Sequence, residues 1–243
     1  MSNRAIELIS DRNLGGLCQY IESNISCLSD MKVMQAILEL FNEDPEFASN
    51  LLQACPVVGT EDGYGDTLLH YASRWDFPHS IKQLINQGFD IDYPNNGFQS
   101  PLFHASQASA QELIHLGASV NLQDINNRTA LSYAVEYEQY DLAELLLLHG
   151  ADVNLVDDYD KTVIFYAVEN ENIEMIDLLA KHGADFHVID RNNLTPLAFS
   201  RGFNNPLLTK HITQLSSITR QLSRISLFTR YNQLFSYARH LMA

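Results

Sequence analysis

A short phrase recurs along the chain at a nearly constant interval, and this repetition constrains the fold more than any other feature of the sequence. The phrase reads GDTLLHYAS in its first copy, NRTALSYAV in its third and DKTVIFYAV in its fourth. The five copies share a hydroxyl residue at one position, and these residues are Thr67, Ser100, Thr129, Thr162 and Thr195. Their spacings of 33, 29, 33 and 33 residues indicate a solenoid of stacked repeats.

A second phrase, built around a glycine, recurs in step with the first. It reads NQGFDID, HLGASVN, LHGADVN and KHGADFH, and its glycines are Gly88, Gly117, Gly150 and Gly183. Between the two phrases, apolar residues such as Leu142, Leu145 and Leu146 lie three or four positions apart, which is typical of one face of a helix. Each repeat is therefore predicted to contain two short helices, with a glycine where the second helix ends.

Together the two phrases resemble the ankyrin repeat, which has a period of 33 residues and the signature T-P-L-H-x-A. Residues 129–134 and 150–154 match it closely, and the resemblance covers residues 61–205. It implies an all-α solenoid of stacked helix-turn-helix units with short hairpin loops, in which the threonine caps the first helix and His70 fixes the turn. Small residues let the helices approach closely, and these are Ala72, Ala105, Ala134 and Ala167. The second repeat is shorter than the others, so a clipped helix pair is expected there.

The flanking segments carry weaker versions of the pattern. Residues 1–60 are predicted to be degenerate ankyrin-like capping helices, because terminal repeats need a polar outer face, and an unrelated helical domain is the alternative. Residues 206–243 carry a stripe of apolar residues that begins at Leu208 and Ile212 and includes Ile218, with basic residues and no acid between them. They are predicted to form a basic amphipathic helical cap on the last repeat, or an interfacial helix that binds an anionic membrane surface.

Charge divides the chain into two parts. Residues 191–243 carry seven basic side chains and no acid, which leaves −22 on residues 1–190 out of a net charge of −15. An acidic body repels phosphate backbones, so nucleic acid is not an expected partner along it. The cysteines Cys18, Cys27 and Cys55 are odd in number and lack metal-site spacing, which favours buried thiols in a reducing compartment. With no signal peptide or spanning apolar run in the sequence, a cytoplasmic location is expected.

No catalytic, metal or cofactor site is predicted, and the chain is not expected to be an enzyme. His115, His149 and His182 lie near helix ends on separate repeats, where they cannot chelate one ion. The acidic residues between Asp152 and Asp160 lack the order of a calcium loop, and the sequence contains no phosphate-loop or nucleophile motif. Such Asp- and Asn-rich loops are expected to bond to their own backbone.

Aromatic and acidic residues in loops and at helix ends are the candidates for partner binding, because these positions vary in the ankyrin family and line its concave face. The candidates are Tyr64, Asp66, Trp75, Phe98, Glu136, Tyr137, Tyr159, Asp160 and Glu169. Tyr71, Tyr133 and Tyr166 share one repeat position and are instead expected to pack against the next repeat. An acidic groove of this kind predicts a protein partner with a basic segment, and a solvated face with scattered aromatics is the alternative.

The repeats are rich in Asn, Ile and Tyr and follow a degenerate front, which resembles the ankyrin effectors that intracellular bacteria send into host cells. This resemblance implies an adaptor or effector that binds a host protein in the host cytoplasm. A membrane-associated scaffold that uses the C-terminal segment is the alternative. Asn154, preceded by Asp152 and Val153, also resembles the pattern that an asparaginyl hydroxylase modifies in ankyrin proteins.

Overall fold

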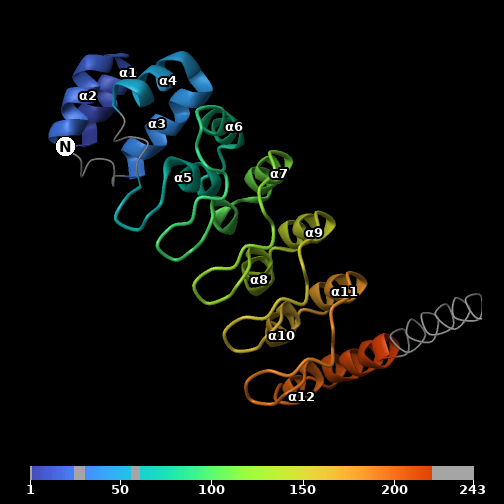
Figure 1. Ribbon diagram of the computed structural model, residues 1–243. Coiled ribbons are helices and arrows are strands. Elements are labelled where there is room, and N and C mark those ends of the chain that lie inside the picture. The colour runs from blue at the N-terminus through green and yellow to red at the C-terminus, as the bar shows by residue number, and fades with distance from the viewer. Residues whose placement is uncertain (1, 25–30, 56–60, 221–243) are drawn as a thin grey trace, which may run out of the picture. The chain divides into compact units, whose positions relative to one another are not determined.

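The computed structural model describes residues 2–24, 31–55 and 61–220, and the regular secondary structure of these ranges is helical (Figure 1). The helices are α1 (Ser2–Ser10), α2 (Leu14–Ser23), α3 (Met31–Glu43), α4 (Pro45–Ala54), α5 (Leu68–Arg74), α6 (Pro78–Asn86), the 3-10 turn η3 (Pro101–His104), α7 (Gln107–His115), α8 (Ala130–Glu136), α9 (Tyr140–Leu148), α10 (Val163–Glu169), α11 (Ile173–Lys181) and α12 (Pro196–Ser200). Residues 206–220 are also helical. The predicted all-α repeat architecture is confirmed.

The chain forms two compact units that divide within the third full repeat. The first unit contains the described residues up to 133 together with 141–151. The second unit contains residues 134–140 and the described residues from 152 onward. No helix in the described part of the chain is long and apolar enough to cross a membrane.

In the first unit, the four N-terminal helices continue into the repeats through α3. Helix α3 packs against α4 of its own pair and against α5 and α6 of the next pair. Its inner face is fully buried at Ile37 and Leu38, and Ser80 of α6 donates a hydrogen bond of 2.9 Å to the carbonyl of Leu38. The N-terminal helices therefore contact the repeats as a preceding repeat would.

Two of the three cysteines are buried thiols, as predicted. Cys18 on α2 and Cys55 at the end of α4 are both buried as free thiols, and their side chains are hydrogen bonded to each other. Burial raises the pKa of Cys18, which keeps it protonated near neutral pH. Cys27 lies outside the described residues.

The predicted hydroxyl caps form at some repeats and are missing at two, Ser100 and Thr162. Thr129 accepts a hydrogen bond from the Ser132 N–H at 3.2 Å, and Thr195 accepts one from the Ala198 N–H at 3.2 Å. The hydroxyl of Thr162 is buried and makes no hydrogen bond, so this position keeps the residue type without the cap. The helix starts there regardless, because Val163, Ile164 and Phe165 bury their side chains.

His70 fixes its turn as the resemblance implied. Its Nδ1 accepts a hydrogen bond from the Thr67 N–H at 3.1 Å, and its Nε2 lies 3.0 Å from the Gln99 carbonyl of the next repeat. An imidazole protonated on Nε2 satisfies both contacts. Burial lowers the pKa of His70, which is consistent with a neutral ring in this role.

The short second repeat has the expected clipped helix pair. Its first helix is reduced to the 3-10 turn η3, because the missing residues remove one helical turn. Two polar atoms are left buried without a hydrogen bond in this turn, the Ser100 hydroxyl and His104 Nε2. This repeat therefore lacks part of the polar bonding that the others have.

Ala167 is one of the small residues that are predicted to let the helices approach closely. Ala167 on α10 is fully buried, and α10 packs against both α11 and α12. We expect Ala167→Leu to lower the free energy of unfolding by about 1–3 kcal/mol, because the larger side chain has no space. Chemical denaturation measures this change, and a variant as stable as the parent would contradict the packing described here.

The C-terminal helix is docked over its first turns. Leu208 and Ile212 are fully buried, and His211 Nε2 lies 2.7 Å from an Asp177 carboxylate oxygen on α11. Ile218, which belongs to the same predicted stripe, is 50% exposed, so the burial does not extend to it. The rest of the stripe, in residues 221–243, lies outside the described residues.

Candidate interaction surface

In the described part of the chain, we call five loops the finger loops (Figure 1). They lie within residues 61–67, 87–100, 116–129, 149–162 and 182–195, and each leads into the first helix of a repeat. Each is closed at its base by one side chain whose Oδ1 accepts hydrogen bonds from the backbone N–H groups two and four residues later. In the fourth loop, Asp157 accepts these bonds from Tyr159 at 2.8 Å and Lys161 at 2.9 Å. The five base residues are Asp62, Asn95, Asp124, Asp157 and Asp190. The sequence predicted that Asp and Asn side chains of these loops bond to the local backbone, and this is confirmed at the five base residues.

The second oxygen of several base carboxylates binds a tyrosine nine residues later. The Tyr71 hydroxyl donates to Asp62 at 2.5 Å and the Tyr133 hydroxyl donates to Asp124 at 2.7 Å. Tyr166 donates to Asp157 in the same way. Burial, together with Asp124, raises the pKa of Tyr133 to about 12. These tyrosines therefore fasten the first, third and fourth finger loops to the first helix of the repeat that follows.

Sequence reasoning missed these tyrosine–aspartate pairs. It placed the tyrosines against the next repeat, although the constant separation of nine residues between an Asp and a Tyr is visible in three repeats. Each ring is half-buried, so packing is part of its role, but the hydroxyl has a defined partner. The carboxylates at the loop bases are consequently structural, and the described residues contain no cluster of side chains able to hold a metal ion.

The second repeat departs from this arrangement. Its base residue is Asn95, and His104 takes the place of the tyrosine. The Asn95 side chain donates to a carboxylate oxygen of Asp66 at 2.8 Å, which an aspartate could not do. Burial and the positive charge of Arg74 lower the pKa of His104 to about 4, so its ring is neutral at physiological pH.

The predicted acidic binding residues differ in how accessible they are. Asp66 is 5% exposed and forms an ion pair of 2.7 Å with Arg74. Although burial opposes ionisation, the hydrogen bonds from Asn95 and Arg74 hold the pKa of Asp66 below its usual value. Asp66 therefore stabilises the first unit and offers little surface to a partner.

The other predicted acids lie nearer to solvent. Glu169 is 51% exposed and 3.5 Å from the Lys161 ammonium, and Asp160 is 59% exposed and 3.9 Å from the Arg191 guanidinium. Glu136, at the end of α8, is half-buried. Exposed pairs of this kind contribute little to stability and remain able to exchange partners.

The predicted aromatic residues separate into two groups. Tyr64 and Phe98 in the first unit are 77% and 60% exposed, and Tyr137 and Tyr159 in the second unit are 66% and 62% exposed. Trp75 is half-buried, and the centre of its ring lies 5.0 Å from that of Tyr71. Trp75 therefore takes part in packing, whereas the first four rings are displayed to solvent.

Four exposed aliphatic residues in the finger loops were not predicted. Ile125 in the first unit is 60% exposed, and in the second unit Val156, Ile189 and Leu194 are 43%, 55% and 36% exposed. Val156 and Ile189 line a shallow hollow of about 490 Å³, whose rim carries Asp160 and Arg191. An irregular loop gives no periodic signal for exposure, so a sequence pattern could not have identified them.

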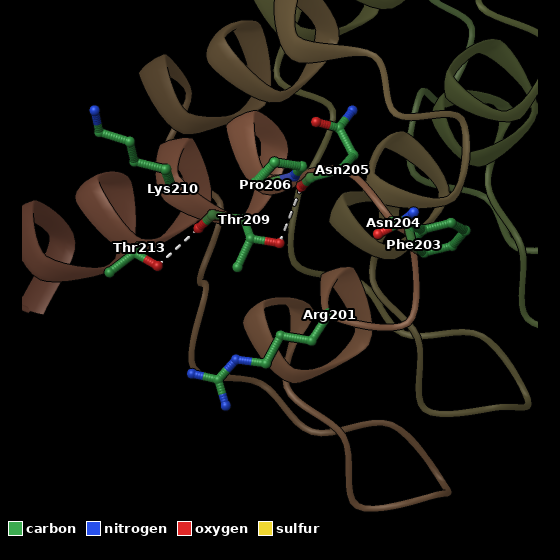
Figure 2. A pocket seen from close by; sticks show the side chains of 8 residues that line it. All are labelled: Arg201, Phe203, Asn204, Asn205, Pro206, Thr209, Lys210 and Thr213. Carbon is green, nitrogen blue, oxygen red and sulfur yellow. Dashed lines mark hydrogen bonds between the residues drawn. The ribbon is translucent and has the colours of Figure 1, made fainter.

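A second hollow of about 480 Å³ lies at the docked C-terminal helix (Figure 2). Its lining includes Arg201 and Lys210, with the hydroxyls of Thr209 and Thr213 between them. Figure 2 shows the Arg201 and Lys210 side chains extending in different directions. Thr209 and Thr213 bond to helix carbonyls, so the groups around this hollow do not converge on one ligand.

Comparison with known proteins agrees with this architecture. The chain matches a family model described as ankyrin repeats (3 copies) over residues 33–124 and 102–190. It belongs to the ankyrin-repeat family, and the match begins within α3, so the helix pair before the first full repeat is included. Ankyrin repeats are generally protein–protein interaction modules.

A curated relative covers a smaller part of the chain. The human protein transient receptor potential cation channel subfamily A member 1 is 32% identical over 93 residues, which are 37% of this chain and 8% of that channel. The chain thus spans less than a tenth of the channel's length.

Proposed function

We propose that this protein is a non-catalytic adaptor that holds a protein partner through aromatic side chains displayed on its finger loops and at the end of α8. The observation that carries the proposal is the exposure of Tyr64, Phe98, Tyr137 and Tyr159, each of them at least 60% accessible. Aromatic rings that stabilise a fold are buried in it, whereas these four are not. Large aromatic side chains are also enriched among the residues that dominate the binding energy of interfaces.

Each unit contributes its own part of the proposed surface. Tyr64 and Phe98 belong to neighbouring finger loops of the first unit, whose backbones are joined by a hydrogen bond of 3.0 Å from Asn96 N–H to the Tyr64 carbonyl. In the second unit, the Arg191 guanidinium lies 5.7 Å from the ring centre of Tyr159 and 3.9 Å from the carboxylate of Asp160. A basic segment of the partner would find its acidic contacts in the second unit.

The remaining functional expectations stay predictions. They are the role of an effector in a host cell, the cytoplasmic location, the membrane-associated alternative and the modification of Asn154. Asn154 itself is exposed and structurally engaged, because its amide donates to the Gly183 carbonyl at 3.1 Å and its Oδ1 accepts from the Asp185 N–H at 2.9 Å.

Affinity capture with matched variants tests the proposal. We expect the double variant Tyr137→Ala, Tyr159→Ala to retain about one tenth or less of the captured partner, because hot-spot aromatics each contribute about 2 kcal/mol or more. Its melting temperature should stay close to that of the parent, since exposed side chains away from the core change stability by only about 0.5 kcal/mol.

Leu148→Ala provides the control for this experiment. Leu148 is 67% exposed at the end of α9, outside the finger loops, so its loss should leave capture unchanged. If the parent, the double variant and the control capture the same proteins in the same amounts, Tyr137 and Tyr159 do not form the binding surface.

A further inference from the structure

One residue of the finger loops adopts a backbone conformation that does not suit it. The residue three positions after each loop base has a positive φ, and the five residues are Gly65 (79°), Phe98 (58°), Asn127 (57°), Asp160 (57°) and Asn193 (59°). Glycine, asparagine and aspartate enter this left-handed region at low cost, whereas a bulky aromatic residue is strained there. Phe98 is the exception among the five.

The turn does not require the phenylalanine side chain. The Phe98 N–H donates to the Asn95 carbonyl at 2.9 Å, and the same bond of 2.9 Å forms from Asn127 to Asp124 and from Asn193 to Asp190. Asparagine therefore builds an equivalent turn in two sister loops. The Phe98 ring is 60% exposed, so burial does not offset its backbone strain.

Phe98 stands in the middle of a row of exposed apolar side chains within the first unit. Tyr64 in the preceding loop is 77% exposed and Ile125 in the following loop is 60% exposed. Backbone hydrogen bonds join the three loops, from Asn96 N–H to the Tyr64 carbonyl at 3.0 Å and from Ile125 N–H to the Gly97 carbonyl at 2.9 Å. We call Tyr64, Phe98 and Ile125 the apolar row.

The tips that carry the apolar row are uncharged. Residues 63–65, 95–98 and 125–127 contain only Gly, Tyr, Asn, Phe and Ile. The carboxylates at the loop bases, Asp62 and Asp124, are occupied by backbone N–H groups and by tyrosine hydroxyls. The fourth loop, in the second unit, differs because its tip contains Asp158 and Asp160.

We propose that the apolar row is the docking site for an uncharged, apolar segment of the protein partner, and that Phe98 is its anchor. The proposal rests on the proposed function for the existence of a partner and goes beyond it by assigning the chemistry recognised by the first unit. A charged ligand would find no counter-charge at these tips, whereas an apolar segment laid across the three neighbouring loops would be desolvated by an apolar side chain from each. The Phe98 ring contributes to binding and not to folding, and this explains why a residue with a strained backbone occupies the position.

The first arm of the test needs no partner. In the full chain, Phe98→Asn should raise the melting temperature by about 2–4 °C, because it relieves the left-handed strain without removing a packed side chain. Leu148→Asn, which replaces an equally exposed apolar residue on a helix, should not raise it. A fall in melting temperature for Phe98→Asn would make Phe98 a structural residue and overturn the proposal.

The second arm uses a displayed library of random peptides selected on the full chain. The selected peptides should carry apolar residues without an excess of Lys or Arg, and Phe98→Asn should weaken their binding about tenfold or more while Leu148→Asn leaves it unchanged. Their affinity should hold between about 50 and about 500 mM salt, since apolar contacts are not screened. Basic peptides with salt-sensitive binding, or peptides indifferent to Phe98, would overturn the proposal.

The two proposals fail in distinguishable ways. Failure of the proposed function appears when neither a captured protein nor any peptide depends on Tyr137, Tyr159, Tyr64 or Phe98. Failure of this further inference alone appears when capture depends on Tyr137 and Tyr159 but is unaffected by Phe98→Asn.

Discussion

Lowering the pH from about 7 to about 4 is expected to reduce the free energy of unfolding by up to about 3 kcal/mol through His104 alone. Burial and the charge of Arg74 place the folded-state pKa of His104 at about 4, below the value of 6.5 that histidine has in an unfolded chain. Between these values the unfolded chain binds a proton that the folded chain does not. The stability contributed by neutral His104 is therefore present above pH 6.5 and is lost as the pH falls toward 4.

Two other groups near His104, His70 and Asp66, also have shifted pKa values and contribute to the pH dependence of stability. The ring of His70 lies 6.3 Å from that of His104, and burial lowers its pKa as well, so it adds to the effect in the same direction. Asp66, whose pKa is held low, acts only at more acidic pH. Urea denaturation at several values from about pH 7.5 to about pH 4.5 separates these contributions.

His104→Gln is the matched variant for the pH experiment. Glutamine does not titrate, so this variant should lose most of the pH dependence and keep only the part due to His70 and the remaining groups. A stability profile that is flat over this range in the parent, or equally steep in the parent and in His104→Gln, would contradict the buried neutral histidine.

Replacing Asp157 by alanine is expected to lower the free energy of unfolding by about 3–4 kcal/mol. The 5% exposed carboxylate accepts hydrogen bonds from the N–H groups of Tyr159 and Lys161 and from the Tyr166 hydroxyl. Hydrogen bonds to a charged group are worth more than neutral ones, and their loss leaves three donors without their acceptor. Thermal and urea denaturation of the full chain measure the change.

Two further variants separate the contributions of Asp157. Asp157→Asn should be milder, because Asn95 shows that an asparagine accepts the same two backbone bonds in the second repeat. Tyr166→Phe should lose about 1–2 kcal/mol, and the double variant with Asp157→Ala should be less destabilised than the sum of the two changes. Strict additivity would mean that the tyrosine and the aspartate do not interact.

Much of the fold followed from the sequence because its period and its turn residues are local signals. The helix pairs, the clipped second repeat and the His70 turn could all be read from residues adjacent in the chain. The missing cap at Thr162 could not, since whether a hydroxyl finds a donor depends on sub-ångström backbone placement that the residue type does not encode. The tyrosine–aspartate pairs do not follow from residues shared at one repeat position, because each pair is a fixed separation of nine residues between two unlike side chains.

The candidate site was predicted in part, and for a related reason. Loop position alone suggested Tyr64, Phe98, Tyr137 and Tyr159, and all four rings are exposed. Position did not reveal that Asp66 is buried against Arg74, because that pair joins two residues eight apart across a helix start. Nor could it reveal the strain at Phe98, which appears only when its backbone is compared with that of the sister loops.

Hydrogen exchange of the protein bound to its captured partner tests the central claim most directly, because it locates the bound surface in each unit without altering a residue. We expect exchange to slow in the finger loops, including the backbone N–H groups of Tyr64 and Gln99 in the first unit and of Tyr159 in the second. The second helices of the repeats, α6, α7, α9 and α11, should be unchanged. Protection confined to those helices, with exchange in the finger loops unaltered, would show that the finger loops do not hold the partner.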